Sequence, residues 1–267
     1  MKKLIIPAII MVVAMACSDA DDPQPAACQP TEIEYFNGFT STFYYFNTSH
    51  NGKNLLSEVS FNPGSAQSID FAYEYLQGRL SKVAFSLGDI TINYAPTFDG
   101  DKLTKLSGTP FGFGIVLYEI VVTYNGDKIS RWDQYIGDPT TGTLYQFQHY
   151  EFTYEGDDMA TSKFYLDETV FDALDNNQTP AAYSPELVIN AEYGYGMKEA
   201  PNPLYMQINL QNPEMSLMQN VPTTIVQRDA SGNIVGSLGY EITFNDQGFP
   251  TLAQSTSAFI DFTYNCN

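Results

Sequence analysis

The segment 118–129, which reads YEIVVTYNGDKI, decides the fold class. Apolar or aromatic residues occupy every second position of its first part, namely Tyr118, Ile120, Val122 and Tyr124. A period of two is the signature of a strand with one buried face. Asn125 and Gly126 then supply the positive backbone dihedrals of a tight hairpin turn, and Ile129 opens a second apolar alternation. The segment therefore predicts a β-hairpin.

The same pattern recurs along the chain, and Phe71, Tyr73 and Tyr75 share one face of another predicted strand. Comparable turns occur at 75–80, 99–103 and 244–249, with weaker copies at 51–55, 154–158 and 229–234. The turn glycines at 52, 78, 100, 126 and 156 are separated by about one hairpin and its return strand. A repeated hairpin predicts a long antiparallel meander, so the fold class is all-β and mainly antiparallel.

The turn motif, written most fully at 75–80 as YLQGRL, resembles the YD repeats of Rhs-type proteins. It resembles still more closely the degenerate copies carried by uncharacterised surface lipoproteins of Bacteroidetes. The resemblance covers about 43–165 and 225–264. It implies an elongated, curled antiparallel sheet and no particular activity. The toxin and protease segments of true Rhs proteins are absent, which removes their known function from consideration.

Between 166 and 222 the rhythm breaks, and prolines accumulate. A short helix is predicted over 168–175, and two strands are predicted over 186–193 and 204–210. Because the repeat resumes afterwards, we interpret this part as a loop-rich insertion, with at most a short helix, in a single β-rich domain spanning 31–267. Long loops on a rigid scaffold are where binding tends to reside.

The first residues predict export and lipid attachment. Lys2 and Lys3 precede an apolar run that is too short to span a membrane, followed by small residues. The stretch 14–17, AMAC, resembles the lipobox of bacterial lipoproteins, which implies a signal peptide over 1–16 and a lipid on Cys17. An ordinary cleaved signal peptide that contains a cysteine is the alternative.

An acidic, proline-containing tether over 17–30 follows. Its start, SDADD at 18–22, resembles the surface-export signal of Bacteroidetes lipoproteins, which implies an outer-membrane anchor with the domain exposed on the cell surface. The alternative is a solvated linker on a periplasmic lipoprotein, since such a composition stays extended.

Acidic residues dominate the charge: 31 Asp and Glu face 12 Lys and Arg, for a net charge of −19. Loss of Lys2 and Lys3 with the signal would change −19 to −21. Such a chain repels phosphate backbones, so nucleic acid is excluded as a partner. Solubility alone is the simpler explanation of the acidity.

Cys28 and Cys266 remain once Cys17 carries lipid. An isolated pair in an oxidising compartment usually bonds, so we expect a disulfide that joins the first ordered segment to the last strand. Two unpaired buried thiols are the alternative.

Catalytic signals are weak, and no catalytic residue is assigned. His50 and His149 lie in no metal or triad spacing, and His149 within 145–154 is interpreted as a polar-face residue of a strand. A glycan hydrolase needs only two carboxylates at a suitable distance, and Glu119, Asp133 and Glu151 are the candidates for that alternative.

Metal and cofactor signals are also weak. Asp99 with Asp101, and Asp157 with Asp158, are hard oxygen ligands at turn tips, but no calcium loop surrounds them and acidic tips are usually just solvated. Neither a metal site nor a cofactor is therefore predicted.

Trp132 and Tyr135 are the candidate ligand-binding residues, since an exposed indole beside Tyr135 would offer a platform for a sugar ring. The alternative places Trp132 in the core. The sequence therefore favours a non-enzymatic surface module that binds a glycan or protein partner, or supports the envelope, with a carboxylate-dependent glycan hydrolase as the alternative.

Overall fold

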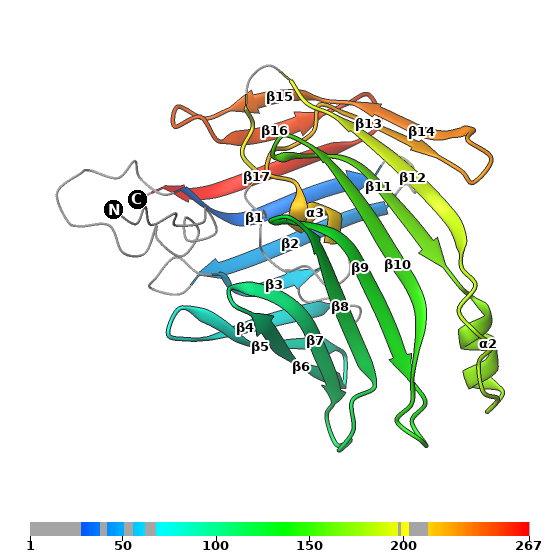
Figure 1. Cartoon of the computed structure of the whole chain (residues 1–267). Coiled ribbons are helices and arrows are strands. Elements are labelled where there is room, and N and C mark those ends of the chain that lie inside the picture. Colours follow the sequence, from blue (N-terminus) through cyan, green and yellow to red (C-terminus); the bar gives the residue numbers. More distant parts are fainter. Residues whose placement is uncertain are drawn as a thin grey trace, which may run out of the picture.

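One antiparallel sheet of 17 strands accounts for most of the chain (Figure 1). The computed structural model describes residues 28–37, 42–50, 56–61, 68–196, 199–202 and 213–266. The prediction of an all-β, mainly antiparallel meander is confirmed. The signal, Cys17, most of the tether, the turn at 51–55 and the strand expected at 204–210 lie outside the described residues.

The strands of the first half are β1 (Cys28–Asn37), β2 (Thr42–His50), β3 (Leu56–Phe61), β4 (Ile69–Leu76), β5 (Arg79–Leu87), β6 (Ile90–Asp99), β7 (Lys102–Pro110), β8 (Tyr118–Asn125) and β9 (Lys128–Gly137). Those of the second half are β10 (Leu144–Glu155), β11 (Asp158–Leu166), β12 (Glu186–Gly194), β13 (Thr224–Arg228), β14 (Ile234–Gly239), β15 (Glu241–Phe244), β16 (Pro250–Gln254) and β17 (Phe259–Cys266).

Each strand from β1 to β13 pairs with the next along the chain. β15 pairs with β16, β16 with β17, and β17 returns to pair with β1. Among the described residues, β14 and β15 each pair on one side only, so they are the edges of an open, curled sheet. These edges are consecutive in the chain, with Tyr240 between them.

The period of two divides the sheet into a core face and an opposite face that is largely polar. Apolar residues from strands across the whole sheet form one buried cluster, which includes Ile33, Phe71, Val83, Leu106, Ile120, Trp132, Phe152, Met159 and Phe262. The curl brings these side chains together, because successive strands rotate in the same sense. Burial of this cluster is the main stabilising term.

Tight turns join many of the strands, and glycine is required in them. Gly78, Gly100, Gly126 and Gly156 have backbone φ angles of 80°, 59°, 63° and 61°, which side chains other than glycine rarely adopt. The predicted hairpins at these turns are confirmed.

In three hairpins a cation just after the turn also ties the hairpin to the next one along the chain. Lys102 Nζ donates to the Gly126 carbonyl at 2.6 Å and lies 5.2 Å from the centre of the Tyr124 ring. Arg79 repeats this arrangement on Gly100 and Phe98, and Lys128 repeats it on Gly156 and Tyr154. The repeated basic residue after the turn therefore has a physical role, which is to hold neighbouring hairpins in register.

The sheet has two unlike ends. The turn end carries the turns at Gly78, Gly100, Gly126 and Gly156, together with Cys28 and Cys266, which are directly opposite each other in the β1–β17 register. The loop end carries the β5–β6, β7–β8 and β9–β10 connections and helix α2 (Thr169–Asp175). In Figure 1 the start of β1 and the end of β17 lie on the opposite side of the molecule from α2. The cysteine side chains lie outside the described part, so the disulfide stays a prediction.

The segment 166–222 contributes to the sheet as well as to loops. The predicted helix is confirmed as α2, and the predicted strand at 186–193 is confirmed as β12. A second short helix, α3 (Pro213–Leu217), was not expected from the sequence. It lies within the curl of the sheet, where Leu217 joins the core and Glu214 accepts a hydrogen bond from Ser162 of β11 (Figure 1). Neither described helix is long and apolar enough to cross a membrane.

Candidate functional site

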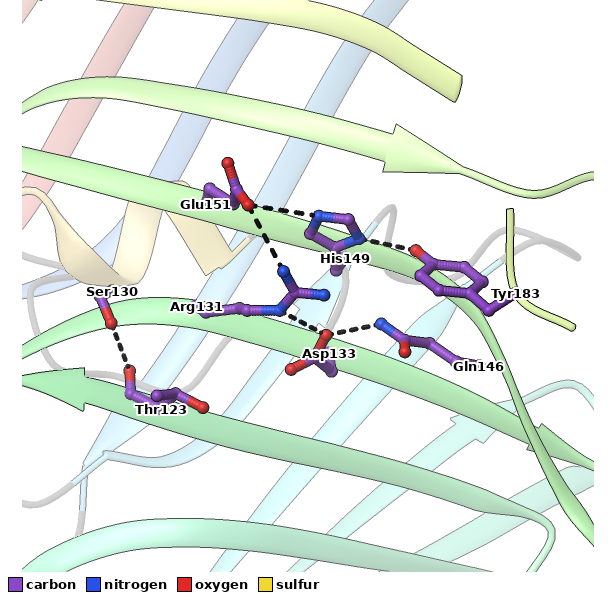
Figure 2. Close-up of polar contacts among 8 residues, drawn as sticks. All are labelled: Thr123, Ser130, Arg131, Asp133, Gln146, His149, Glu151 and Tyr183. Carbon is purple, nitrogen blue, oxygen red and sulfur yellow. Dashed lines mark hydrogen bonds and ion pairs between the residues drawn. The ribbon is translucent and has the colours of Figure 1, made fainter. Parts of the chain in front are cut away.

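A polar cluster lies on the face of β9 and β10 that is opposite to the core (Figure 2). We define it by six residues: Arg131 and Asp133 of β9, Gln146, His149 and Glu151 of β10, and Tyr183 of the loop after α2. The register places His149 opposite Asp133 and Glu151 opposite Arg131. An irregularity between Gln146 and Gln148 brings Gln146 to the same face.

Arg131 joins the two carboxylates of the cluster. Its Nε donates to Asp133 Oδ1 at 2.8 Å, and its Nη1 lies 3.4 Å from Glu151 Oε1. Gln146 Nε2 donates to the same Asp133 oxygen at 2.6 Å. Asp133 is only 7% exposed, so these bonds offset the cost of burying its charge. Beside the cluster, Ser130 Oγ donates to the Thr123 carbonyl at 3.3 Å and ties β9 to β8.

His149 is enclosed by two tyrosines. Its ring is 4% exposed, stacks on Tyr165 with a centroid distance of 4.4 Å, and has Nδ1 2.6 Å from the Tyr183 hydroxyl. Burial and the nearby Arg131 guanidinium lower the pKa of His149, against the opposing effect of Asp133 and Glu151. His149 is therefore neutral at neutral pH, and the tautomer that fits has Nδ1 accepting from Tyr183 and Nε2–H directed at Glu151, 3.7 Å away.

Asp167 holds the loop that carries Tyr183. Its carboxylate accepts from the Thr169 hydroxyl at 2.6 Å and from the Ser184 amide at 2.8 Å, while its own amide donates to the Phe147 carbonyl. Burial raises the pKa of Asp167, but these hydrogen bonds outweigh burial, and the net effect is a lowered pKa. The ionised carboxylate of Asp167 thus fixes the loop that carries Tyr183.

The three carboxylates predicted for a hydrolase share this face of the sheet, but they are not free. Asp133 and Glu151 are bound to Arg131, and Glu119 is 3.3 Å from Lys105 Nζ and accepts from Ser107. An acid–base pair needs one carboxyl that holds a proton at working pH, and such groups lie in apolar or like-charged surroundings. These carboxylates instead have cations as neighbours, so the arrangement suits binding better than proton transfer.

Trp132 and Tyr135, the predicted binding pair, lie on opposite faces of β9. Trp132 is 3% exposed and belongs to the core, as the alternative interpretation held, so its ring forms no exposed platform. Successive side chains of a strand point to opposite faces of the sheet. Arg131 and Asp133, on either side of Trp132, point to the polar face, so Trp132 points to the core. Tyr135 shares the face of the polar cluster and is opposite both Glu119 and Gln146 in register.

Two of the four turn-tip aspartates, Asp157 and Asp158, have ordinary structural partners. Asp157 pairs with Lys128 at 2.8 Å, and Asp158 accepts from Asn220 at 2.9 Å. Within the described ranges, three or more potential metal ligands do not gather anywhere.

A second surface, which we call the apolar rim, lies at the loop end. It consists of the exposed residues Leu87, Ile90, Phe111, Phe113 and Ile115. Phe111 is 82% exposed, and its amide donates to the Thr91 carbonyl, which places the β7–β8 loop beside the β5–β6 turn. Exposed apolar groups gathered in this way mark a contact surface more often than isolated ones do.

Comparison with solved structures finds a similar fold in a Bacteroides protein. A porin-like protein from Bacteroides uniformis aligns with a TM-score of 0.50 and 11% identity over 91% of this chain and 100% of that one. A porin-like protein from Bacteroides vulgatus gives a TM-score of 0.48 and 10% identity over 90% of this chain and 99% of that one. At this level of identity the likeness concerns the fold alone. No family model and no curated protein matches the sequence.

Sequence reasoning missed three members of the polar cluster. Arg131 and Gln146 are ordinary strand residues in the sequence, and Tyr183 belongs to an aperiodic loop. The alternation of Arg131, Asp133 and Tyr135 on one face of β9 is the signal that could have pointed to Arg131.

Proposed function

We propose that this chain is an outer-membrane lipoprotein whose β domain acts at the cell surface as a non-enzymatic binding module. The observation that carries the proposal is the polar cluster. Its side chains are held in place by one another, each carboxylate has a cation beside it, and His149 is neutral. Pre-organised hydrogen-bonding groups without a free acid or base suit recognition of a ligand.

The two unlike ends of the sheet support the proposed location on the cell surface. A lipid on Cys17 and the tether that follows would connect the membrane to the turn end of the domain, where β1 begins. The loop end would then point away from the membrane, which leaves the loops and the polar face open to ligands. The B. uniformis structure with the same fold comes from the group of bacteria whose lipoproteins the sequence resembles. A periplasmic lipoprotein is the alternative address.

Affinity electrophoresis of the mature protein in gels that contain single polysaccharides tests binding against hydrolysis. We expect at least one polysaccharide to retard the protein and none to yield new reducing ends after long incubation. Release of reducing ends, abolished by Glu151→Gln, would support the hydrolase alternative and contradict the proposal.

The apolar rim favours a protein partner as a second candidate function. Apolar area removed from water contributes about 25 cal/mol per Å², so the rim could anchor a partner without any charge contact. A photo-crosslinking amino acid in place of Phe113 should give a defined product on intact cells, while one in place of Leu76 at the turn end should not. Equal products from both positions would argue against a specific rim contact.

A further inference from the structure

The position of the polar cluster in the sheet limits what can bind there. β9 pairs with β8 and β10, and β10 pairs with β9 and β11, so both strands have their edges filled. An extended peptide that adds to a sheet needs a free edge, and these strands offer none. The exposed large apolar residues lie elsewhere, chiefly at the loop end. A ligand of the cluster must therefore be recognised by polar and aromatic side chains.

The charged groups of the cluster and its neighbouring strands already have partners, and the carboxylate of Asp167, beneath the Tyr183 loop, accepts hydrogen bonds from Thr169 and Ser184. Three carboxylates, Asp133, Glu151 and Glu119, face three cations on the same side of the sheet, namely Arg131, Lys105 and Lys163, which is opposite Glu151 in register. A charged ligand would have to compete with one of these existing contacts and leave a partner unpaired, which is costly in a partly buried site. An uncharged ligand avoids that cost.

The cluster has hydrogen-bonding groups that remain available to a ligand. They suit a ligand that donates and accepts hydrogen bonds at neighbouring atoms. Asp133 Oδ2 and Arg131 Nη2 take part in none of the bonds found among the described residues, and the Glu151 carboxylate is exposed over 43% of its side chain. A hydroxyl can donate to a carboxylate while its oxygen accepts from the guanidinium. Adjacent hydroxyls of a sugar ring satisfy both groups at once.

Aromatic rings border the same groups. Tyr165 stacks over His149, Tyr183 lies edge-on to the imidazole with its hydroxyl at Nδ1, and Tyr135 lies opposite Gln146. Tyrosine combines an apolar ring with a polar tip. The C–H faces of a sugar can pack on such rings while its hydroxyls reach the charged groups between them.

From these four features we infer that the polar cluster binds an uncharged oligosaccharide. The inference rests on the proposed binding function and adds the class of ligand and its place. Acidic saccharides are disfavoured further, because the whole chain carries a net charge of −19 and repels them. The central contacts are Arg131 and Glu151, and the tyrosines supply the surrounding surface.

Isothermal titration of the mature protein tests the inference with defined hexasaccharides. Cello-, manno-, xylo- and maltohexaose are the neutral probes, hexagalacturonate is the acidic probe and the glucosamine hexamer is the basic one. Glu151→Gln and Arg131→Lys are the variants of the cluster. Glu192→Gln is the matched control, because Glu192 forms a similar ion pair with Arg228 at 3.2 Å on the same face and has a similar exposure of 46%.

We expect at least one neutral hexasaccharide to bind, each cluster variant to weaken it by about tenfold or more, and the control to leave it unchanged. Near-ultraviolet circular dichroism and thermal unfolding show whether each variant is folded, and a variant that fails to fold is replaced by Glu151→Asp. Tighter binding of the acidic or basic probe would overturn the ligand class. Neutral binding that all variants retain would overturn the site but leave the proposed function intact. Failure of every probe here, together with failure of every polysaccharide in the gel assay, would count against both.

Discussion

Replacement of both Cys28 and Cys266 by serine should destabilise the domain strongly. The two residues are partners in the β1–β17 register. Residues that are directly opposite in an antiparallel pair have Cα atoms about 4.5 to 5.5 Å apart, which lies within the range that a disulfide spans. The bond would close a loop of roughly 240 residues and so restrict the unfolded chain.

The magnitude follows from the length of that loop. In the chain-entropy model a loop of this size contributes about 5 to 6 kcal/mol, and measured values are usually smaller. For a domain of this size each kcal/mol corresponds to about 2 to 4 °C in the melting temperature. The double variant should therefore melt roughly 10 to 20 °C below the wild type, and the wild type should fall to the same value when it is reduced.

The assay is thermal and urea unfolding of the mature domain from Ser18, with and without reductant, beside the double variant. Thiol titration after denaturation counts the free cysteines. Two free thiols in the non-reduced wild type, or equal melting temperatures for all samples, would refute the reasoning.

Three further predictions concern contacts inside the sheet. Lys128→Met should lower the free energy of unfolding by about 1 kcal/mol. The ammonium contacts with the Gly156 carbonyl and the Tyr154 ring are lost, while the apolar stem of the side chain remains. An unchanged urea midpoint would argue against the hairpin contact. Folding lowers the pKa of His149, so the unfolded chain binds the proton of this imidazole more tightly than the folded one. The stability of the wild type should therefore fall as the pH drops below about 6.5, and His149→Gln should lack this part of the decrease in stability. Identical pH profiles of the melting temperature for the two proteins would contradict this prediction. Burial raises the pKa of Glu214, so the folded state holds the proton of this carboxyl to a higher pH than the unfolded state does. Stability should therefore fall as the pH rises above about 4.3, and Glu214→Gln should remove this decline. A decline that persists in the variant would show that another group causes it.

The local part of the fold could be predicted from the sequence, because hairpins depend on neighbouring residues. A strand with alternating apolar residues followed by a glycine turn specifies its own partner, as in β8 and β9. The return of β17 to β1 joins opposite ends of the chain, and no local pattern encodes it. Only the isolated pair of cysteines indicated that these strands meet. The curl also results from many small rotations between strands.

The site was harder to predict, because it depends on register across strands. Asp133, His149 and Glu151 were each noticed in the sequence, but nothing there shows that they face one another. Their meeting depends on the β9–β10 register and on the irregularity next to Gln146. Tyr183 arrives from a loop without periodicity, whose position depends on the buried carboxylate of Asp167.

The most direct test of the account is whether the loop end faces the medium on living cells. Thr140, in the exposed β9–β10 loop, offers a site for labelling when it is replaced by cysteine. A membrane-impermeant maleimide should label the Thr140→Cys protein on intact cells as fully as after lysis, while the wild type stays unlabelled. Labelling that requires lysis would show that the domain faces the periplasm, and the proposed surface binding module would then be wrong.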